Sequence, residues 1–159
     1  MDNVIHMENL TKVYSGKVPA LDNLNLDVRR GEIFGYLGPN GAGKTTTIRL
    51  LLDLIRPTAG GATILGMDAR RDSVAIKQHV GYLPGELNLW DRQTAQQTIN
   101  FVGQARGGYD ARYVRELADL LQFDLTKKVR SYSTGNKRKL GLILALMNKP
   151  DLLILDEPS

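Results

Sequence analysis

The chain is 159 residues long, with 42% apolar residues, 24% charged residues and a formal net charge of +4. These values are typical of one globular domain with a hydrophobic core. The chain has no cysteine and only two histidines, which excludes disulfides, thiolate metal sites and histidine-rich metal sites. No apolar run approaches the roughly 18 residues of a membrane-spanning helix, and no secretory signal is expected at the N-terminus.

The first thirty residues have the pattern of half-buried β-strands. Polar and apolar residues alternate over 4–10 and more regularly over 20–28, and Arg29-Arg30-Gly31 predicts a turn. We therefore expect an antiparallel β layer, followed by a buried central strand at 33–37. Tyr14 falls between the first two strands. An exposed ring there could stack on a nucleobase, although a tyrosine near a strand end more often packs on the sheet.

Residues 38–45, Gly-Pro-Asn-Gly-Ala-Gly-Lys-Thr, match the phosphate-binding pattern G-x-x-x-x-G-K-[ST] at every specified position. Glycines allow successive backbone N–H groups to point inward, and the N-terminus of the following helix adds partial positive charge. Lys44 can then reach the β- and γ-phosphates, and the Thr45 hydroxyl can ligate Mg²⁺. The alternative, an ordinary glycine-rich turn between a strand and a helix, fits this spacing poorly.

The helix that follows the loop has an apolar stripe at Ile48, Leu51, Leu52 and Ile55, and we expect it to end at Arg56-Pro57. The remaining pattern alternates strands with helices. Strands are predicted at 62–65, 80–83 and 152–155, and helices at 68–79, at 135–147 and on either side of Gly107-Gly108 between 94 and 122.

Two basic clusters lie at 127–130 and 137–139. They could contact nucleic acid or an anionic membrane, but such clusters are more often solvated helix faces.

The last predicted strand ends in Asp156-Glu157-Pro158-Ser159. In isolation this is a strand end with two solvated acids. Beside a bound nucleotide, however, the aspartate can hold Mg²⁺ and the next carboxylate can polarise an attacking water. Together with the phosphate loop, the two acids predict a nucleoside triphosphatase.

A third motif makes this prediction more specific. Residues 132–136, Tyr-Ser-Thr-Gly-Asn, precede the basic cluster 137–139, and the segment resembles the signature of ATP-binding cassette (ABC) proteins, commonly Leu/Tyr-Ser-Gly-Gly-Gln/Met. With GPNGAGKTT and LLILDEPS in the same order, the resemblance covers nearly the whole chain. It is most similar to ATPase subunits of bacterial drug-efflux and export systems, in which the ATPase and the membrane permease are separate polypeptides.

The resemblance implies an α/β fold of the P-loop NTPase class, with three layers around a parallel central sheet. It adds an N-terminal antiparallel β subdomain and an inserted α-helical subdomain that docks on the permease. The implied parts of this single ABC domain are the antiparallel layer at 1–31, the core at 32–86, the helical subdomain with the signature at 87–135, and the signature helix with the last strand at 136–159.

The resemblance also implies residue roles. Thr45 and Asp156 match the Mg²⁺ ligands, and Glu157 matches the general base. Ser133, Thr134 and Gly135 belong to the signature, which contacts the γ-phosphate bound by the opposite subunit. The positions that match nucleotide-binding residues are Tyr14, Gly38, Asn40, Gly41, Gly43, Lys44, Thr45 and Thr46.

The implied cofactors are ATP and Mg²⁺. The implied partners are transmembrane permease subunits and a second ATPase subunit, in a homo- or heterodimer, with no direct contact to nucleic acid. The implied location is cytoplasmic, at the inner face of the cell membrane.

The sequence departs from the family pattern at a few positions. Thr134 replaces a glycine of the signature, and a β-branched residue is unfavourable wherever φ is positive or a phosphate approaches the backbone. Asn136 stands where glutamine or methionine is usual. Gly85 stands where the family has the glutamine of its Q-loop, and Glu86 could substitute for it.

The family pattern continues beyond position 159 with a D-loop, another core strand and a switch histidine, and neither His6 nor His79 matches that histidine. We therefore expect a fragment of a longer ATPase, with an incomplete central sheet that is marginally stable or completed by pairing with another chain. We expect little hydrolysis by residues 1–159 alone.

Two other functions are open. One is a non-transport ABC ATPase of the translation or DNA-repair type. The absence of a heptad-patterned insertion between Lys44 and Ser133 favours a transporter. The other is a nucleotide-binding module without catalysis, which the presence of Glu157 at the general-base position disfavours.

Overall fold

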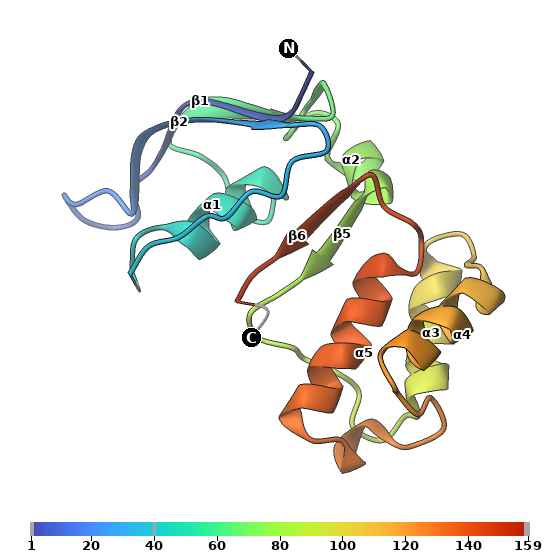
Figure 1. The fold of residues 1–159 in the computed structure, drawn as a ribbon. Helices are drawn as coiled ribbons and strands as arrows, with labels where there is room; N and C mark the ends of the chain where they lie inside the picture. Colours follow the sequence, from blue (N-terminus) through green and yellow to red (C-terminus); the bar gives the residue numbers. More distant parts are fainter. Residues whose placement is uncertain (1, 40, 158–159) are drawn as a thin grey trace. The chain divides into compact units, whose positions relative to one another are not determined.

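The structure is a computed structural model that describes residues 2–39 and 41–157 (Figure 1). It forms two compact units, Met1–Lys77 and Gln78–Ser159, and each is described by itself. Both units combine helices with a β-sheet, so the expected α/β class is confirmed. Within the described residues, no helix has the length and apolar character needed to cross a membrane.

The first unit contains an antiparallel sheet with the strand order β2-β1-β3-β4. In the central strand β1, Met7 lies opposite Leu26 of β2 on one side and Ala62 of β3 on the other. The sheet confirms the expected antiparallel layer and extends it by two strands. Its elements are β1 (Asn3–Lys12), β2 (Leu21–Arg29), β3 (Ala59–Ile64) and β4 (Met67–Asp68).

The expected central strand at 33–37 is wrong for this structure. Residues 32–39 form no strand, and Ile33 and Leu37 are 102% and 91% exposed. A strand needs a hydrogen-bonded neighbour, and none of the described strands pairs with this segment. The apolar run therefore forms no strand with the part of the chain that the structure describes. One side-chain contact joins it to the next helix, from the Tyr36 hydroxyl to Thr47 Oγ1 at 3.2 Å.

The helix after the phosphate loop, α1 (Lys44–Leu51), ends earlier than expected. The next residues turn away because Asp53 adopts a left-handed conformation with φ of 54°. Aspartate tolerates this conformation better than most residues. Leu52 is still buried, but Ile55 lies beyond the helix and is only partly buried. The stop is thus at Asp53, before the proline.

The expected helix at 68–79 is also shorter, because Asp68 belongs to β4 and α2 (Ser73–His79) starts later. The Asp68 side chain explains the difference. Its Oδ1 accepts hydrogen bonds from the backbone N–H groups of Arg70 and Arg71, each at 2.9 Å, which fixes a turn where the helix was expected.

In the second unit, α3, α4 and α5 lie together beside a two-stranded parallel sheet (Figure 1). The expected pair of helices on either side of Gly107 and Gly108 is confirmed, and both glycines have positive φ. The elements are β5 (Val80–Leu83), α3 (Ala95–Ala105), α4 (Ala111–Leu120), the short 3₁₀ helix η1 (Val129–Ser131), α5 (Thr134–Leu146) and β6 (Leu152–Leu155).

Polar caps fix the starts of these helices. Thr94 and Gln97 form a reciprocal capping box at the start of α3, and Asp110 accepts from two backbone N–H groups at the start of α4. The core between the helices is apolar. Its most deeply buried members are Ala95, Ile99, Val114, Val129, Leu140, Ile143 and Met147.

Two glycines allow α5 to pack closely on β5. A methyl group added at Gly81 would come within 2.2 Å of the Ala145 carbonyl oxygen, and one at Gly141 within 2.6 Å of a Leu83 methyl carbon. At both places the helix and strand are too close for a side chain. This packing holds α5 close against β5.

We predict that Gly81→Ala destabilises the protein by about 1–3 kcal/mol, because the new methyl group must displace the backbone of α5. Gly61→Ala is the matched control, since Gly61 is also a strand glycine but has open space around it. Its effect should stay within about 0.5 kcal/mol. Urea unfolding measures both free energies, and equal values for the two variants would contradict the prediction.

Candidate functional site

The phosphate loop of the first unit is shaped by two glycines in the left-handed conformation. Gly41 and Gly43 have φ values of 84° and 83°, which residues with a side chain rarely adopt. Between them, the Ala42 N–H donates to the Pro39 carbonyl at 3.1 Å and closes a turn. Asn40, also predicted to bind nucleotide, lies outside the described residues.

The loop leads into α1, and no side chain caps the N-terminus of this helix. Gly43 is the N-cap residue, and its carbonyl accepts from both the backbone N–H and the hydroxyl of Thr47, at 2.8 and 2.9 Å. Since no side chain caps the N–H groups of the first turn, they can receive an anion. Thr45 and Thr46, both half-buried, lie in this turn. Sequence reasoning missed Thr47, which anchors the loop from inside.

The Lys44 ammonium group lies over the same loop. It donates hydrogen bonds to the carbonyl oxygens of Gly38 and, at 3.0 Å, of Pro39. An ammonium group has three donors, so a phosphate group beside the loop could take the place of a carbonyl acceptor. The structure thus places Gly38, Gly41, Gly43 and Lys44 together in one loop and helix start.

The loop also packs against the start of β2. A methyl group on Gly43 would lie 2.7 Å from the Ala20 carbonyl oxygen, so this contact requires glycine. Tyr14 lies in the connection between β1 and β2 and is 51% exposed. The Lys12 ammonium group lies 5.1 Å from the centroid of its ring, a cation–π contact.

The second unit holds the predicted acids at the end of β6. The Asp156 N–H donates to the Leu83 carbonyl at 2.9 Å, which continues the pairing of β6 with β5 past the strand. Asp156 is buried, with 5% of its surface exposed, whereas Glu157 is exposed and has a φ of 50°. Gly85 lies next to the Asp156 carboxylate, since a methyl group added to Gly85 would lie 3.6 Å from Asp156 Oδ2. The Q-loop position is therefore adjacent to Asp156.

Arg138 contacts this strand end. Its guanidinium group donates to the backbone carbonyl of Pro84 at 3.0 Å and to that of Glu157 at 2.7 Å. Sequence reasoning placed Arg138 in a basic cluster, where a solvated helix face was the favoured interpretation. In the same cluster, Lys137 pairs with Asp91 at 3.2 Å. No sequence signal distinguished Arg138 from its neighbours, because both of its partners are backbone atoms.

The signature residues form the start of α5. Ser133 is the N-cap, and its hydroxyl accepts from the Asn136 N–H at 3.2 Å. Thr134 is the first helical residue and has no positive φ, so its β-branch causes no backbone strain. Gly135 is exposed, and a methyl group added to it would meet only the Ser133 hydroxyl, at 4.0 Å.

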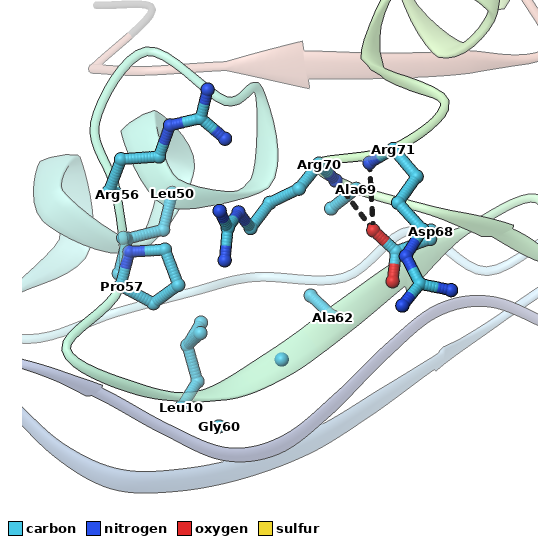
Figure 2. Close-up of a pocket in the computed structure, with 11 residues that line it drawn as sticks. Leu10, Leu50, Arg56, Pro57, Gly60, Ala62, Asp68, Ala69, Arg70 and Arg71 are labelled. Atoms are coloured by element: carbon cyan, nitrogen blue, oxygen red, sulfur yellow. Dashed lines mark hydrogen bonds between the residues drawn. The ribbon is translucent and has the colours of Figure 1, made fainter.

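The first unit also has a groove of about 450 Å³ (Figure 2). Arg56, Arg70 and Arg71 line it together with Asp68. Hydrogen bonds from the backbone N–H groups of Arg71 and Arg70 hold the pKa of the Asp68 carboxyl below its usual value. Of the predicted nucleotide-binding residues that the structure describes, none lines this groove.

The donor set of the predicted site suits Mg²⁺. Among the described residues there is no group of three acidic, histidine or cysteine side chains that could hold a metal ion. Mg²⁺ does not need one, because it is commonly bound by one or two protein oxygens together with substrate phosphates and water. The Thr45 hydroxyl and the Asp156 carboxylate are such oxygens. Thr45 belongs to the first unit and Asp156 to the second.

Comparison with known proteins gives a consistent result. The model of the family described as ABC transporter matches residues 21–159. The chain is 37% identical over 163 residues to the probable multidrug ABC transporter ATP-binding protein YbhF of Escherichia coli, covering 99% of the chain and 28% of the relative. It is 37% identical to the bacitracin transport ATP-binding protein BcrA of Bacillus licheniformis, covering 100% of the chain and 52% of the relative. It is 40% identical to the daunorubicin resistance ATP-binding protein DrrA3 of Streptomyces coeruleorubidus, covering 99% and 51%.

Solved structures of ABC proteins have a similar fold. An ATP-binding subunit of an ABC transporter superposes with a TM-score of 0.84 at 28% identity, over 98% of the chain and 66% of that structure. The ATP-binding cassette MJ0796, solved as a dimer in a post-hydrolysis state with ADP and Pi, superposes with a TM-score of 0.85 at 23% identity, over 98% and 74%. This second likeness supports the fold alone.

The chain spans between about a quarter and a half of the length of these curated relatives. The family match nevertheless covers most of the chain and contains the phosphate loop, the signature and the two acids. The chain therefore belongs to the ABC transporter family and represents its ATP-binding part.

Proposed function

We propose that the complete protein binds and hydrolyses ATP and uses the energy to export a compound through a separate membrane permease. The observation that carries this proposal is the loop before α1. Left-handed Gly41 and Gly43 and an uncapped helix N-terminus form a cradle for phosphate groups, with the Lys44 ammonium beside it.

Each remaining role follows from chemistry that the residue can perform. The Thr45 hydroxyl and the Asp156 carboxylate supply oxygen ligands for Mg²⁺, which would neutralise charge on the bound phosphates. Glu157 is exposed directly after the metal-binding aspartate, where it can accept a proton from an attacking water. Tyr14 presents a half-exposed ring for the base of the nucleotide.

The signature is proposed to act on the ATP of a second ATPase subunit. The open surface at Gly135 and the N-terminus of α5 are suited to a phosphate that approaches from outside this chain. Two ATPase subunits that face one another would bring the signature of each to the ATP of the other, so the proposed working unit is a dimer. The names of the relatives refer to multidrug transport, bacitracin transport and daunorubicin resistance, and they support a drug or antibiotic as the transported compound. The proposed location is the cytoplasmic face of the membrane, beside permease subunits.

We predict that Glu157→Gln lowers the ATPase rate of the complete protein by about 10²–10⁴, because the general base is lost. Release of inorganic phosphate from purified protein measures the rate. Glu116→Gln is the control, since Glu116 is an exposed carboxylate of α4 whose contact is a surface ion pair with Arg112. Wild-type turnover in Glu157→Gln would show that the base is another group.

Tyr14→Ala is expected to weaken ATP binding by about 1–3 kcal/mol, the usual contribution of stacking a base on an aromatic ring. Tyr14→Phe keeps the ring and should bind within about twofold of the wild type. Fluorescence titration with a labelled ATP analogue gives both affinities. Equal losses in the two variants would indicate that the hydroxyl, and not the ring, contacts the nucleotide.

Gly135→Ala is expected to lower ATPase activity without loss of stability. The chain itself has room for the methyl group, and alanine favours the helix by up to about 1 kcal/mol. A loss of activity would therefore indicate that a group from outside this chain approaches Gly135 closely. Thermal unfolding and phosphate release are measured together, and unchanged activity would remove the reason for a phosphate contact at Gly135.

A further inference from the structure

Arg138 joins the two strand ends next to the proposed catalytic group. One guanidinium nitrogen, Nη1, donates to the Pro84 carbonyl at 3.0 Å, and the other, Nη2, donates to the Glu157 carbonyl at 2.7 Å. Pro84 directly follows β5, and Glu157 lies two residues after β6. One side chain of α5 therefore links the carboxyl ends of two neighbouring parallel strands.

The chemistry of this link requires arginine. Both acceptors are backbone carbonyl groups that lie beyond the last residue pair of the β5–β6 ladder. A guanidinium group presents donors on separate nitrogens in a rigid plane, whereas a lysine ammonium is a single point of charge. Hydrogen bonds from a charged donor are also stronger than neutral ones. Arg138 can thus hold both carbonyl groups in fixed directions.

The contact matters because the backbone at Glu157 is in an unfavourable conformation. Its φ of 50° is left-handed, which costs energy for any residue with a side chain. The Arg138 bond to the Glu157 carbonyl stabilises this conformation. Since the side chain is mounted on the same backbone, the bond also restricts where the Glu157 carboxylate can point.

We propose that Arg138 is a positioning residue for Glu157. Its guanidinium group holds the backbone that orients the general base. Arg138 lies on the signature helix α5, one turn after Thr134. A shift of α5 would therefore move the proposed base. This inference rests on the proposed function, because it assigns Glu157 as the base.

The test uses the complete protein with Arg138→Gln, Arg138→Lys and Arg112→Gln. We expect Arg138→Gln to lower kcat by about 10- to 100-fold, since small misplacements of a reacting group have effects of this size. The KM for ATP should change less than about threefold. Arg138→Lys keeps the charge but loses the two-donor plane, and its kcat should lie between those of Arg138→Gln and the wild type. Arg112→Gln removes an exposed guanidinium of α4 and should leave kcat unchanged.

A double-mutant cycle separates positioning from a general loss of structure. If Arg138 acts through Glu157, adding Arg138→Gln to Glu157→Gln should lower the residual single-turnover rate less than about twofold. If instead the rate losses of the two single variants multiply in the double variant, the inference is overturned, because Arg138 then contributes independently of the base.

The outcomes also distinguish this inference from the proposed function. Wild-type turnover in Glu157→Gln would refute the assignment of the base and the inference together. A loss in Glu157→Gln combined with wild-type kcat in both Arg138 variants would overturn the inference alone. Where Arg138→Gln does not fold, Arg138→Lys decides: a reduced kcat at an unchanged melting temperature supports positioning, and a wild-type kcat overturns it.

Discussion

The close packing of α5 on β5, one strand of the parallel pair, is the constraint on which the second unit depends. Gly81 and Gly141 remove the side chains that would hold helix and strand apart. At this short distance, Arg138 of α5 reaches the carbonyl groups beyond both strands. The same packing fixes Ser133, the N-cap of α5, relative to the strand end. A signature element and a candidate base are therefore parts of one packed body.

The first unit solves a different problem, which is to present backbone N–H groups to an anion. It does so with backbone conformation more than with side chains, through Gly41 and Gly43. The buried hydroxyl of Thr47 and the contact of Gly43 with Ala20 hold the loop in place. Two structural reasons thus require glycine at position 43, its positive φ and its close contact with β2, in addition to any requirement of a bound phosphate.

Much of the fold follows from local pattern. The bounds of β5, β6 and the helix that starts at the signature, and the break at Gly107-Gly108, were predicted nearly correctly, because apolar runs and glycine or proline end signals mark them. The predicted bounds were wrong where strand pairing or side-chain hydrogen bonds decide the local structure. The segment 33–37 has the composition of a central strand but no partner among the described strands. The helix α1 ends at Leu51, where the left-handed Asp53 turns the chain away and no proline marks the end.

The sequence by itself determined the chemical identity of the candidate site, since the phosphate loop, the signature and the paired acids are contiguous motifs whose residue types state what they can bind. It could not show which surrounding residues hold these motifs in place. Arg138 and Thr47 act through backbone carbonyl groups, and every residue has one, so no residue pattern identifies the partner. Only the tertiary structure brings a guanidinium group from α5 to the ends of two strands that are distant in sequence, because the packing of helix on sheet sets that distance.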